Sequence, residues 1–94
     1  GKGAQKNPEK AFHYYKLSAE QGNIYAKNNL GWCYLEGEGT QKNPEKAFHY
    51  YKLSAEQGDS DAQYNLAYCY KYGEGTQKNL EEAIKYFSLS KNQD

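Results

Sequence analysis

Cysteine and histidine are the side chains of this chain whose chemistry most often marks a transition-metal site or a reactive thiol. Cys33 and Cys69 are the two cysteines, and His13 and His49 are the two histidines. Neither histidine has a second histidine or a cysteine three or four residues away, the spacing with which one helix holds a metal. We therefore predict no metal, no cofactor and no catalytic residue in this set.

Two glutamates, Glu38 and Glu74, stand in copies of a Gly-Glu-Gly sequence that invites comparison with phosphate-binding loops. Those loops follow a strand and continue into Gly-Lys-Ser or Gly-Lys-Thr, and neither copy continues in that way. A single glutamate without a partner acid is also not the signature of a glycoside hydrolase. We interpret both copies as turns between helices and predict that the protein is not an enzyme.

Charge and composition exclude further classes of protein. The chain has 12 lysines, no arginine and 12 acidic residues, so its formal net charge is zero. This balance argues against nucleic acid as a partner, and no apolar run reaches the roughly 18 residues needed to cross a membrane. The absence of methionine predicts that the chain is a piece of a longer protein.

An internal repeat organises the chain. Residues 5–22 and 41–58 are identical, an offset of 36 residues, and residues 73–94 continue the pattern. This period fits two helices of about a dozen residues each and two turns. We predict one domain over residues 1–94, with repeat units 1–36 and 37–72 and a partial unit 73–94.

The first type of helix in each repeat, which we call the B helix, is clearest at residues 44–57. Asn43 is a natural N-cap, Pro44 a natural first helical residue, and Gly58 suits the position after the helix end. Identical residues mark an earlier copy, and Asn79 starts a third. The sequence therefore predicts three B helices.

The second type, which we call the A helix, is expected at about residues 24–36 and 60–72. Asp59 or Ser60 would cap the second A helix. The predicted order is B-A-B-A-B, an all-α array of antiparallel helix pairs with about two and a half repeats. Equivalent positions in neighbouring repeats should lie about 8–10 Å apart. A disulfide needs Cα atoms within about 7 Å, so we expect Cys33 and Cys69 to be free and buried.

The two A helices share some residues and differ in others. The shared residues follow the spacing of an apolar helical stripe, which predicts packing: Ala26/Ala62, Asn29/Asn65, Leu30/Leu66, Cys33/Cys69 and Tyr34/Tyr70. Gly31 and Ala67 are small enough to let a neighbouring helix approach closely. The last B helix has Lys85, Lys91 and Asn92 where its copy has His49, Ala55 and Glu56, which predicts a polar outer face.

The residues that differ lie on another face of the A helix, within an arc of about 100°. Stacked repeats have equal packing needs, so we interpret this face as the wall that contacts a partner. It comprises Tyr25, Asn28, Trp32, Leu35 and Glu36 in the first A helix, and Asp61, Tyr64, Tyr68, Lys71 and Tyr72 in the second. The alternative is that its aromatic residues only pack on neighbouring helices.

The chain resembles the Sel1-like repeat family. The resemblance is carried by residues 62–75 (AQYNLAYCYKYGEG) and 43–58 (NPEKAFHYYKLSAEQG). It extends over essentially the whole chain, and the departures, Ala67 and Ser54, replace one small residue with another. It implies a right-handed α-solenoid related to tetratricopeptide repeats. It also implies an adaptor that holds partner proteins together through a concave face lined by A helices.

We therefore expect a scaffold that binds a protein or peptide, with no membrane partner. The aromatic residues at the predicted wall suggest hydrophobic or proline-containing segments as ligands. The alternative is a structural spacer that self-associates weakly through an exposed repeat end. Free cysteines, with no glycosylation sequon and no signal-peptide pattern, predict a cytoplasmic location.

Overall fold

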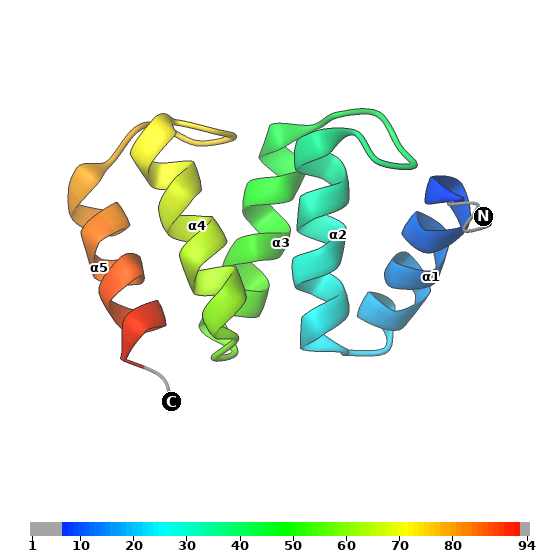
Figure 1. The fold of residues 1–94 in the computed structure, drawn as a ribbon, viewed down its shortest axis with the longest axis horizontal. Helices are drawn as coiled ribbons and strands as arrows, with labels where there is room; N and C mark the ends of the chain where they lie inside the picture. Colours follow the sequence, from blue (N-terminus) through cyan, green and yellow to red (C-terminus); the bar gives the residue numbers. More distant parts are fainter. Residues whose placement is uncertain (1–6, 93–94) are drawn as a thin grey trace, which may run out of the picture.

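The computed structural model describes residues 7–92, which form five α-helices joined by short turns (Figure 1). In chain order the helices are α1 (Pro8–Glu20), α2 (Ile24–Glu36), α3 (Pro44–Glu56), α4 (Ser60–Tyr72) and α5 (Leu80–Lys91). The predicted order is confirmed, with α1, α3 and α5 as B helices and α2 and α4 as A helices. Both A helices have the predicted bounds, and α3 ends one residue before its predicted end.

Side-chain caps begin each helix where the sequence predicts. Asn43 Oδ1 accepts a hydrogen bond of 3.1 Å from the backbone N–H of Lys46, with Pro44 as the first helical residue. At the start of α4, Asp59 rather than Ser60 is the cap, because its Oδ2 accepts from the N–H of Ala62 at 3.2 Å. Such caps satisfy backbone donors that have no partner within the helix.

The Gly-Glu-Gly sequences are the turns that the sequence predicts. Gly37 has a φ of +75° and donates its N–H to the Cys33 carbonyl at 2.8 Å, which ends α2 in a left-handed residue. The chain then folds back, and the Asn43 N–H donates to the Tyr34 carbonyl at 2.7 Å. The cap of α3 is therefore fixed directly to the end of α2.

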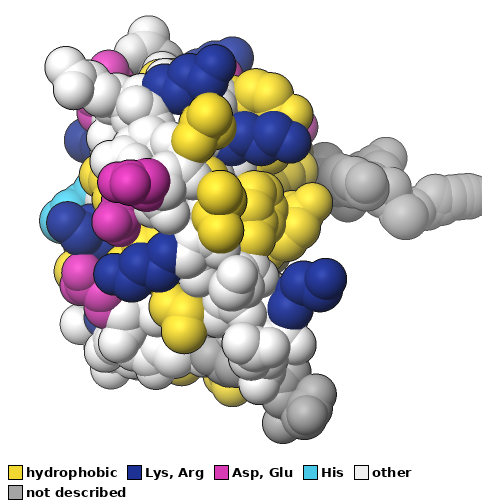
Figure 2. All heavy atoms as spheres, turned by 90° about the vertical axis from the view of Figure 1, so that its left-hand side faces the viewer, with side chains coloured by type: hydrophobic (Ala, Val, Ile, Leu, Met, Phe, Trp, Pro, Cys, Tyr) yellow, Lys and Arg dark blue, Asp and Glu magenta, His cyan; other side chains and the backbone are white. Residues whose placement is uncertain are grey.

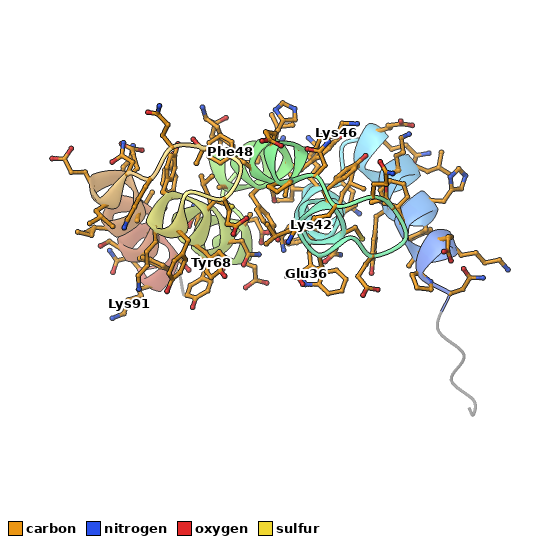
Figure 3. All side chains as sticks on the ribbon, turned by 90° about the horizontal axis from the view of Figure 1, so that it is seen from above. Glu36, Lys42, Lys46, Phe48, Tyr68 and Lys91 are labelled. Carbon is orange, nitrogen blue, oxygen red and sulfur yellow. The ribbon has the colours of Figure 1, made fainter. Side chains whose placement is uncertain are left out.

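The five helices lie side by side in a row measuring 42 × 27 × 26 Å (Figure 1). Each packs against the helix before and after it in the sequence. Seen from above, α2 and α4 lie along one side of the row and α3 lies along the other (Figure 3). The A helices therefore share one side of the molecule.

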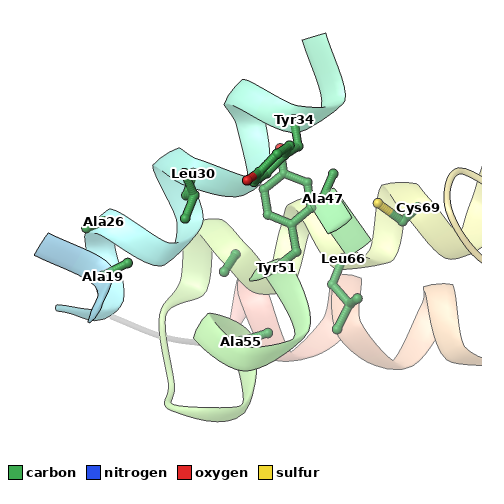
Figure 4. Close-up of a cluster of buried hydrophobic side chains, with 10 residues drawn as sticks. Ala19, Ala26, Leu30, Tyr34, Ala47, Tyr51, Ala55, Leu66 and Cys69 are labelled. Carbon is green, nitrogen blue, oxygen red and sulfur yellow. The ribbon is translucent and has the colours of Figure 1, made fainter. Parts of the chain in front are cut away.

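Tyr51 of α3 stands at the centre of the hydrophobic core, with 1% of its surface exposed (Figure 4). Leu30 and Leu66 are buried with it. A Cβ atom at Gly31 would lie 2.8 Å from two carbons of the Tyr51 ring, closer than real contacts allow. The prediction that Gly31 lets a neighbouring helix approach is confirmed.

The apolar stripe predicted for the A helices is correct except at its edge. Its alanine, leucine and cysteine pairs are buried, whereas Tyr34 is buried and Tyr70 is half-buried. The prediction is wrong for Asn29, which is exposed, because this position lies at the margin of the stripe and its amide stays in water. Asn65 is half-buried.

The outer face of α5 is less polar than predicted. Lys85 and Lys91 are exposed as expected, but Leu80, Ile84 and Leu89 are also 55%, 65% and 41% exposed. Figure 2 views this end of the row and shows apolar side chains beside the lysines. Lys85 and Lys91 therefore share this face with apolar side chains that remain exposed.

Candidate functional site

The predicted partner-binding wall lies on α2 and α4, on the side of the row that carries Glu36 and Tyr68 (Figure 3). Phe48 and Lys46 of α3 lie on the opposite side. Eight of the ten predicted residues are exposed: Tyr25, Trp32, Glu36, Asp61, Tyr64, Tyr68, Lys71 and Tyr72. Asn28 and Leu35 are half-buried. We call these ten residues the A-helix face.

The aromatic residues of the A-helix face retain much of their surface. Trp32 is 48% exposed, Tyr68 is 42% and Tyr72 is 57% exposed. The rings of Tyr68 and Tyr72 lie 4.8 Å apart, and the Lys71 ammonium lies 5.3 Å from the Tyr72 ring. The second A helix therefore presents two adjacent phenol rings with a lysine ammonium nearby. Tyrosine is enriched at protein interfaces, whereas lysine is not.

Three residues of the A-helix face also serve internal packing. The Asn65 amide donates a 3.0 Å hydrogen bond to Asn28 Oδ1, which links α4 to α2. Leu35 packs against the hydrophobic core. Tyr64 contacts Phe87 of α5, with ring centroids 5.2 Å apart, although it is 55% exposed. For these residues the alternative reading, contact with neighbouring helices, holds in part.

A small hollow of about 130 Å³ lies between the ends of α2 and α4. It is lined by Leu35, Glu36, Lys42, Tyr68 and Glu74. Lys42 and Glu74 were not predicted as site residues, since they belong to the turns after the A helices. Their only sequence signal is the exact repetition of those turns. The two carboxylates and one ammonium make the rim of this hollow polar.

A larger cleft of about 340 Å³ lies between α1 and α2. We call it the α1–α2 cleft; its lining residues are Asn7, Pro8, Ala11, Tyr15, Trp32, Cys33 and Glu38. Trp32 therefore borders both this cleft and the A-helix face. This cleft cannot be predicted from the sequence, because α1 and α3 have the same residues and only their neighbours differ.

The two thiols lack the properties of reactive cysteines. Cys33 and Cys69 are buried and free, as predicted. Burial raises the pKa of the Cys69 thiol to about 12, and the Glu74 carboxylate adds to the rise. Burial likewise raises the pKa of Cys33, with a smaller contribution from Glu38. Since the thiolate is the nucleophile, neither group is activated at neutral pH.

The other candidate side chains are dispersed. His13 and His49 are exposed on α1 and α3. Among residues 7–92, no three histidine, cysteine, aspartate or glutamate side chains are grouped so that they could hold a metal ion. No helix in this range is long and apolar enough to cross a membrane. The described surface therefore carries exposed aromatic side chains, and its potential metal ligands are not clustered.

Solved structures place this arrangement in a known class. A Sel1 repeat protein from Oxalobacter formigenes superposes with a TM-score of 0.87 at 36% identity, covering 95% of this chain and 36% of that protein. Helicobacter pylori cysteine rich protein B superposes with a TM-score of 0.83 at 30% identity, covering 92% of this chain and 65% of that protein.

A third structure is c5321, a protective antigen of uropathogenic Escherichia coli strains with the SLR fold. It superposes with a TM-score of 0.82 at 34% identity, covering 87% of this chain and 18% of that protein. The chain therefore spans less than two thirds of the length of each of these proteins. No curated protein matches the chain.

The fold is thus an α-solenoid of helical repeats. The Sel1 repeat family matches residues 1–23, 24–59 and 60–94, so the chain belongs to this family. The second and third matches begin at the first residues of α2 and α4, which makes α2–α3 and α4–α5 the helix pairs of the family repeat. Sel1 repeats are typically non-catalytic modules for protein interaction.

Proposed function

We propose that the chain is a scaffold module that binds a protein or peptide on the A-helix face. The observation that carries the proposal is the exposure of Trp32, Tyr68 and Tyr72 at positions where the two A helices differ. Residues needed for stacking recur between repeats, whereas these do not. Tryptophan and tyrosine are also the residues that most often dominate binding energy at protein interfaces.

The ligand that suits this face is an extended or helical segment with apolar side chains. Ring faces of tyrosine and tryptophan bind apolar and proline-containing segments through contact area, and the hydroxyls remain available to donate hydrogen bonds. Lys71, Glu36 and Glu74 at the edges of the face would orient polar groups of the ligand. The face carries both signs of charge, so nucleic acid is not the partner we propose.

The proposal is tested by selecting peptides from a random display library against the chain and measuring the affinity of the selected peptides. Trp32→Ala and Tyr68→Ala should each weaken binding at least tenfold. Ile84→Ala on α5 removes an even more exposed apolar side chain outside the face and should leave the affinity within twofold. Unchanged affinity in folded Trp32→Ala and Tyr68→Ala proteins would refute the proposal.

A second candidate function is a structural spacer that self-associates. It is favoured by the exposure of Leu80, Ile84 and Leu89 on α5, since exposed apolar side chains at the end of a repeat array are candidate contacts between copies. Sedimentation over a range of concentrations separates the two functions. A monomer at every concentration supports the ligand-binding scaffold, whereas a concentration-dependent dimer that Ile84→Glu abolishes supports the spacer.

The cellular location that we propose is the cytoplasm. The support is that Cys33 and Cys69 are free thiols, which persist in reducing compartments. Fractionation of cells that produce the parent protein, followed by immunodetection, tests this location. Recovery in a secreted or periplasmic fraction would refute it.

A further inference from the structure

A pocket of about 310 Å³ lies where the end of α2 and the turn after it meet α1 and α3. Its charged lining residues are three lysines, and no carboxylate of the described residues belongs to the lining: Lys16 of α1, Lys42 of the turn and Lys46 of α3. The other lining residues are Phe12, Tyr34, Thr40, Gln41 and Asn43. We call this site the lysine pocket.

Packing around Tyr34 holds the elements of the lysine pocket together. The Phe12 ring meets the Tyr34 ring edge to face, with centroids 5.4 Å apart, and Lys46 Nζ lies 5.3 Å from the centre of the same ring. The Asn43 N–H donates to the Tyr34 carbonyl at 2.7 Å. A Cβ atom at Gly39 would lie 2.9 Å from Phe12 Cβ, so the turn also packs closely against α1. Contacts among three helices and the turn therefore fix the shape of the pocket.

The three ammonium groups of the lysine pocket have no counter-charge of their own. None of Lys16, Lys42 and Lys46 forms an ion pair with a carboxylate of residues 7–92. A concave site lined by one sign of charge concentrates its potential and attracts ions of the opposite sign. Thr40 and Gln41 add a hydroxyl and an amide that can donate hydrogen bonds. This set of donors suits an anion with several acceptor oxygens.

The repeat supplies a copy of the lysine pocket that differs at one residue. Seven of the eight lining residues recur 36 positions later: Phe48, Lys52, Tyr70, Thr76, Gln77, Lys78 and Asn79. The eighth position, that of Lys46, is occupied by Glu82. The copy therefore has two positive charges and one negative charge where the lysine pocket has three positive charges. Lys52 is exposed although α3 has a helix on each side, so repeat stacking leaves this position open.

The framework of the two copies is the same. The Phe48 and Tyr70 rings meet edge to face with centroids 5.3 Å apart, and the Asn79 N–H donates to the Tyr70 carbonyl at 2.8 Å. Burial raises the pKa of Tyr70, and the Glu82 carboxylate adds to the rise, so Glu82 lies near this ring as Lys46 lies near its own. The two sites are therefore matched in structure and differ in charge.

We propose that the lysine pocket binds a phosphate monoester, carried by a phosphorylated side chain of a protein or by a free small molecule. Such a group has a charge between about −1.5 and −2 at neutral pH and three acceptor oxygens. It matches three ammonium groups better than a carboxylate, which has one charge and two oxygens. Lysine is a common ligand of phosphate, which it binds as a compact point charge.

The lysine pocket is separate from the A-helix face. Lys46 lies on the opposite side of the row from Glu36 and Tyr68 (Figure 3). Lys42 is the one residue that lines both the lysine pocket and the hollow beside the A-helix face. The proposal therefore goes beyond the proposed function, and either can fail without the other. Trp32→Ala, in the A-helix face, should leave the affinity for phosphate within twofold.

The proposal is tested by NMR titration of the isotope-labelled 94-residue chain at constant ionic strength. The two probes are inorganic phosphate and a short glycine peptide with one phosphoserine, and both should shift the amide signals of residues 40–43 saturably. A phosphopeptide that binds at least tenfold tighter than phosphate indicates a protein as the source, and equal or weaker binding indicates a small molecule. Either result supports the proposal.

Two further ligands separate a phosphate monoester from other anions. The same peptide with glutamate in place of phosphoserine should bind at least tenfold more weakly, and equal binding would overturn the proposal. A single-stranded oligonucleotide without a terminal phosphate carries only diesters with one charge each. Tighter binding of this oligonucleotide than of the phosphopeptide would also overturn the proposal.

The internal copy provides matched variants. Lys46→Glu gives the lysine pocket the residues of its copy, where the fold accepts glutamate, and should weaken phosphopeptide binding at least tenfold. Lys52→Glu makes the same change of charge in the same helix outside the pocket and should leave the affinity within twofold. An equal loss in both variants, or an unchanged affinity in Lys46→Glu, would overturn the proposal.

A gain of binding tests the proposal without relying on a loss. Glu82→Lys gives the copy the same eight residues as the lysine pocket. It should add a second site, with saturable shifts at residues 76–79 and two phosphopeptides bound per chain. A Glu82→Lys protein that gains no site there would overturn the proposal. Shifts spread evenly over the exposed lysines of the original chain would overturn it as well.

Discussion

Ser54 Oγ donates a 2.8 Å hydrogen bond to the Ile24 carbonyl, joining the last turn of α3 to the first turn of α2. The hydroxyl is fully buried and also lies 3.3 Å from Oδ2 of Asp59, the cap of α4. Ser90 Oγ makes the same bond to the Ser60 carbonyl at 3.0 Å in the next helix pair. One small hydroxyl per repeat thus fixes how an A helix and the following B helix align.

Replacement of this serine should therefore be costly. We expect Ser54→Ala to lower the free energy of unfolding by about 0.5–1.5 kcal/mol, because it removes the fully buried hydroxyl that bonds to the Ile24 carbonyl. Ser18→Ala is a matched control, since Ser18 stands in the same thirteen-residue sequence but is half-buried. It should cost less than about 0.5 kcal/mol in urea denaturation. Equal costs at both serines would contradict this account of the alignment.

The close approach of α2 and α3 depends on the absence of a side chain at Gly31. Gly31→Leu should lower the free energy of unfolding by about 2–3 kcal/mol, because the new side chain would overlap the ring of Tyr51. Asn29→Leu introduces the same side chain at an exposed position of the same helix and should change stability by less than about 0.5 kcal/mol. A Gly31→Leu protein as stable as the original would show that α2 and α3 are not in contact at this point.

The A-helix face should be dispensable for folding. Tyr68 is 42% exposed and Tyr51 is 1% exposed, so their replacement by alanine should differ greatly. We expect Tyr51→Ala to cost about 3–5 kcal/mol and Tyr68→Ala about 1 kcal/mol or less, as measured by urea denaturation. A loss from Tyr68→Ala as large as that from Tyr51→Ala would assign Tyr68 to the core and remove it from the proposed binding face.

Alkaline pH should destabilise the protein through Cys69. Its pKa rises from an ordinary value of 9.0 in the unfolded chain to about 12 in the folded protein, mainly because of burial. The folded state therefore retains the proton longer, and this contribution to stability is present below pH 9 and is lost between pH 9 and about pH 12. At pH 10.5 the loss from this group should reach about 2 kcal/mol.

The measurement is the free energy of unfolding at pH 8 and pH 10.5 for the original chain and for Cys69→Ala. The alkaline loss should be smaller in Cys69→Ala by about 2 kcal/mol. Burial also raises the pKa of Tyr51, and the Cys69 thiolate adds to that rise, so any coupling between the two groups enters the difference with the same sign. Identical alkaline losses would mean that Cys69 is not buried as the structure places it.

The sequence predicts the helices well because their limits are local. Asn43 caps its helix through a bond three residues away, and Gly37 ends another by adopting a backbone conformation that disfavours other residues. These interactions need no distant partner, so they can be read along the chain. Comparison of the two A helices also separates most exposed positions from buried ones. Successive residues of a helix are about 100° apart, so the spacing of residues in the sequence shows which of them share a face.

What the sequence does not predict depends on contacts between repeats. Asn28 and Leu35 differ between the A helices yet are half-buried, because Asn65 of α4 and the core reach them across the helix boundary. Tyr15 and Tyr51 have identical neighbours in sequence but different exposure, because only Tyr51 has a helix on both sides. The α1–α2 cleft is therefore visible only in three dimensions.

Ligand binding on the A-helix face is tested most directly by NMR. The isotope-labelled chain is titrated with a peptide selected from a random display library, and its amide and indole signals are recorded at each step. We expect the largest changes at the Trp32 indole and at the exposed residues of α4 from Tyr64 to Tyr72. Changes confined to α3 or α5, with the Trp32 and Tyr68 signals unmoved, would contradict binding on this face.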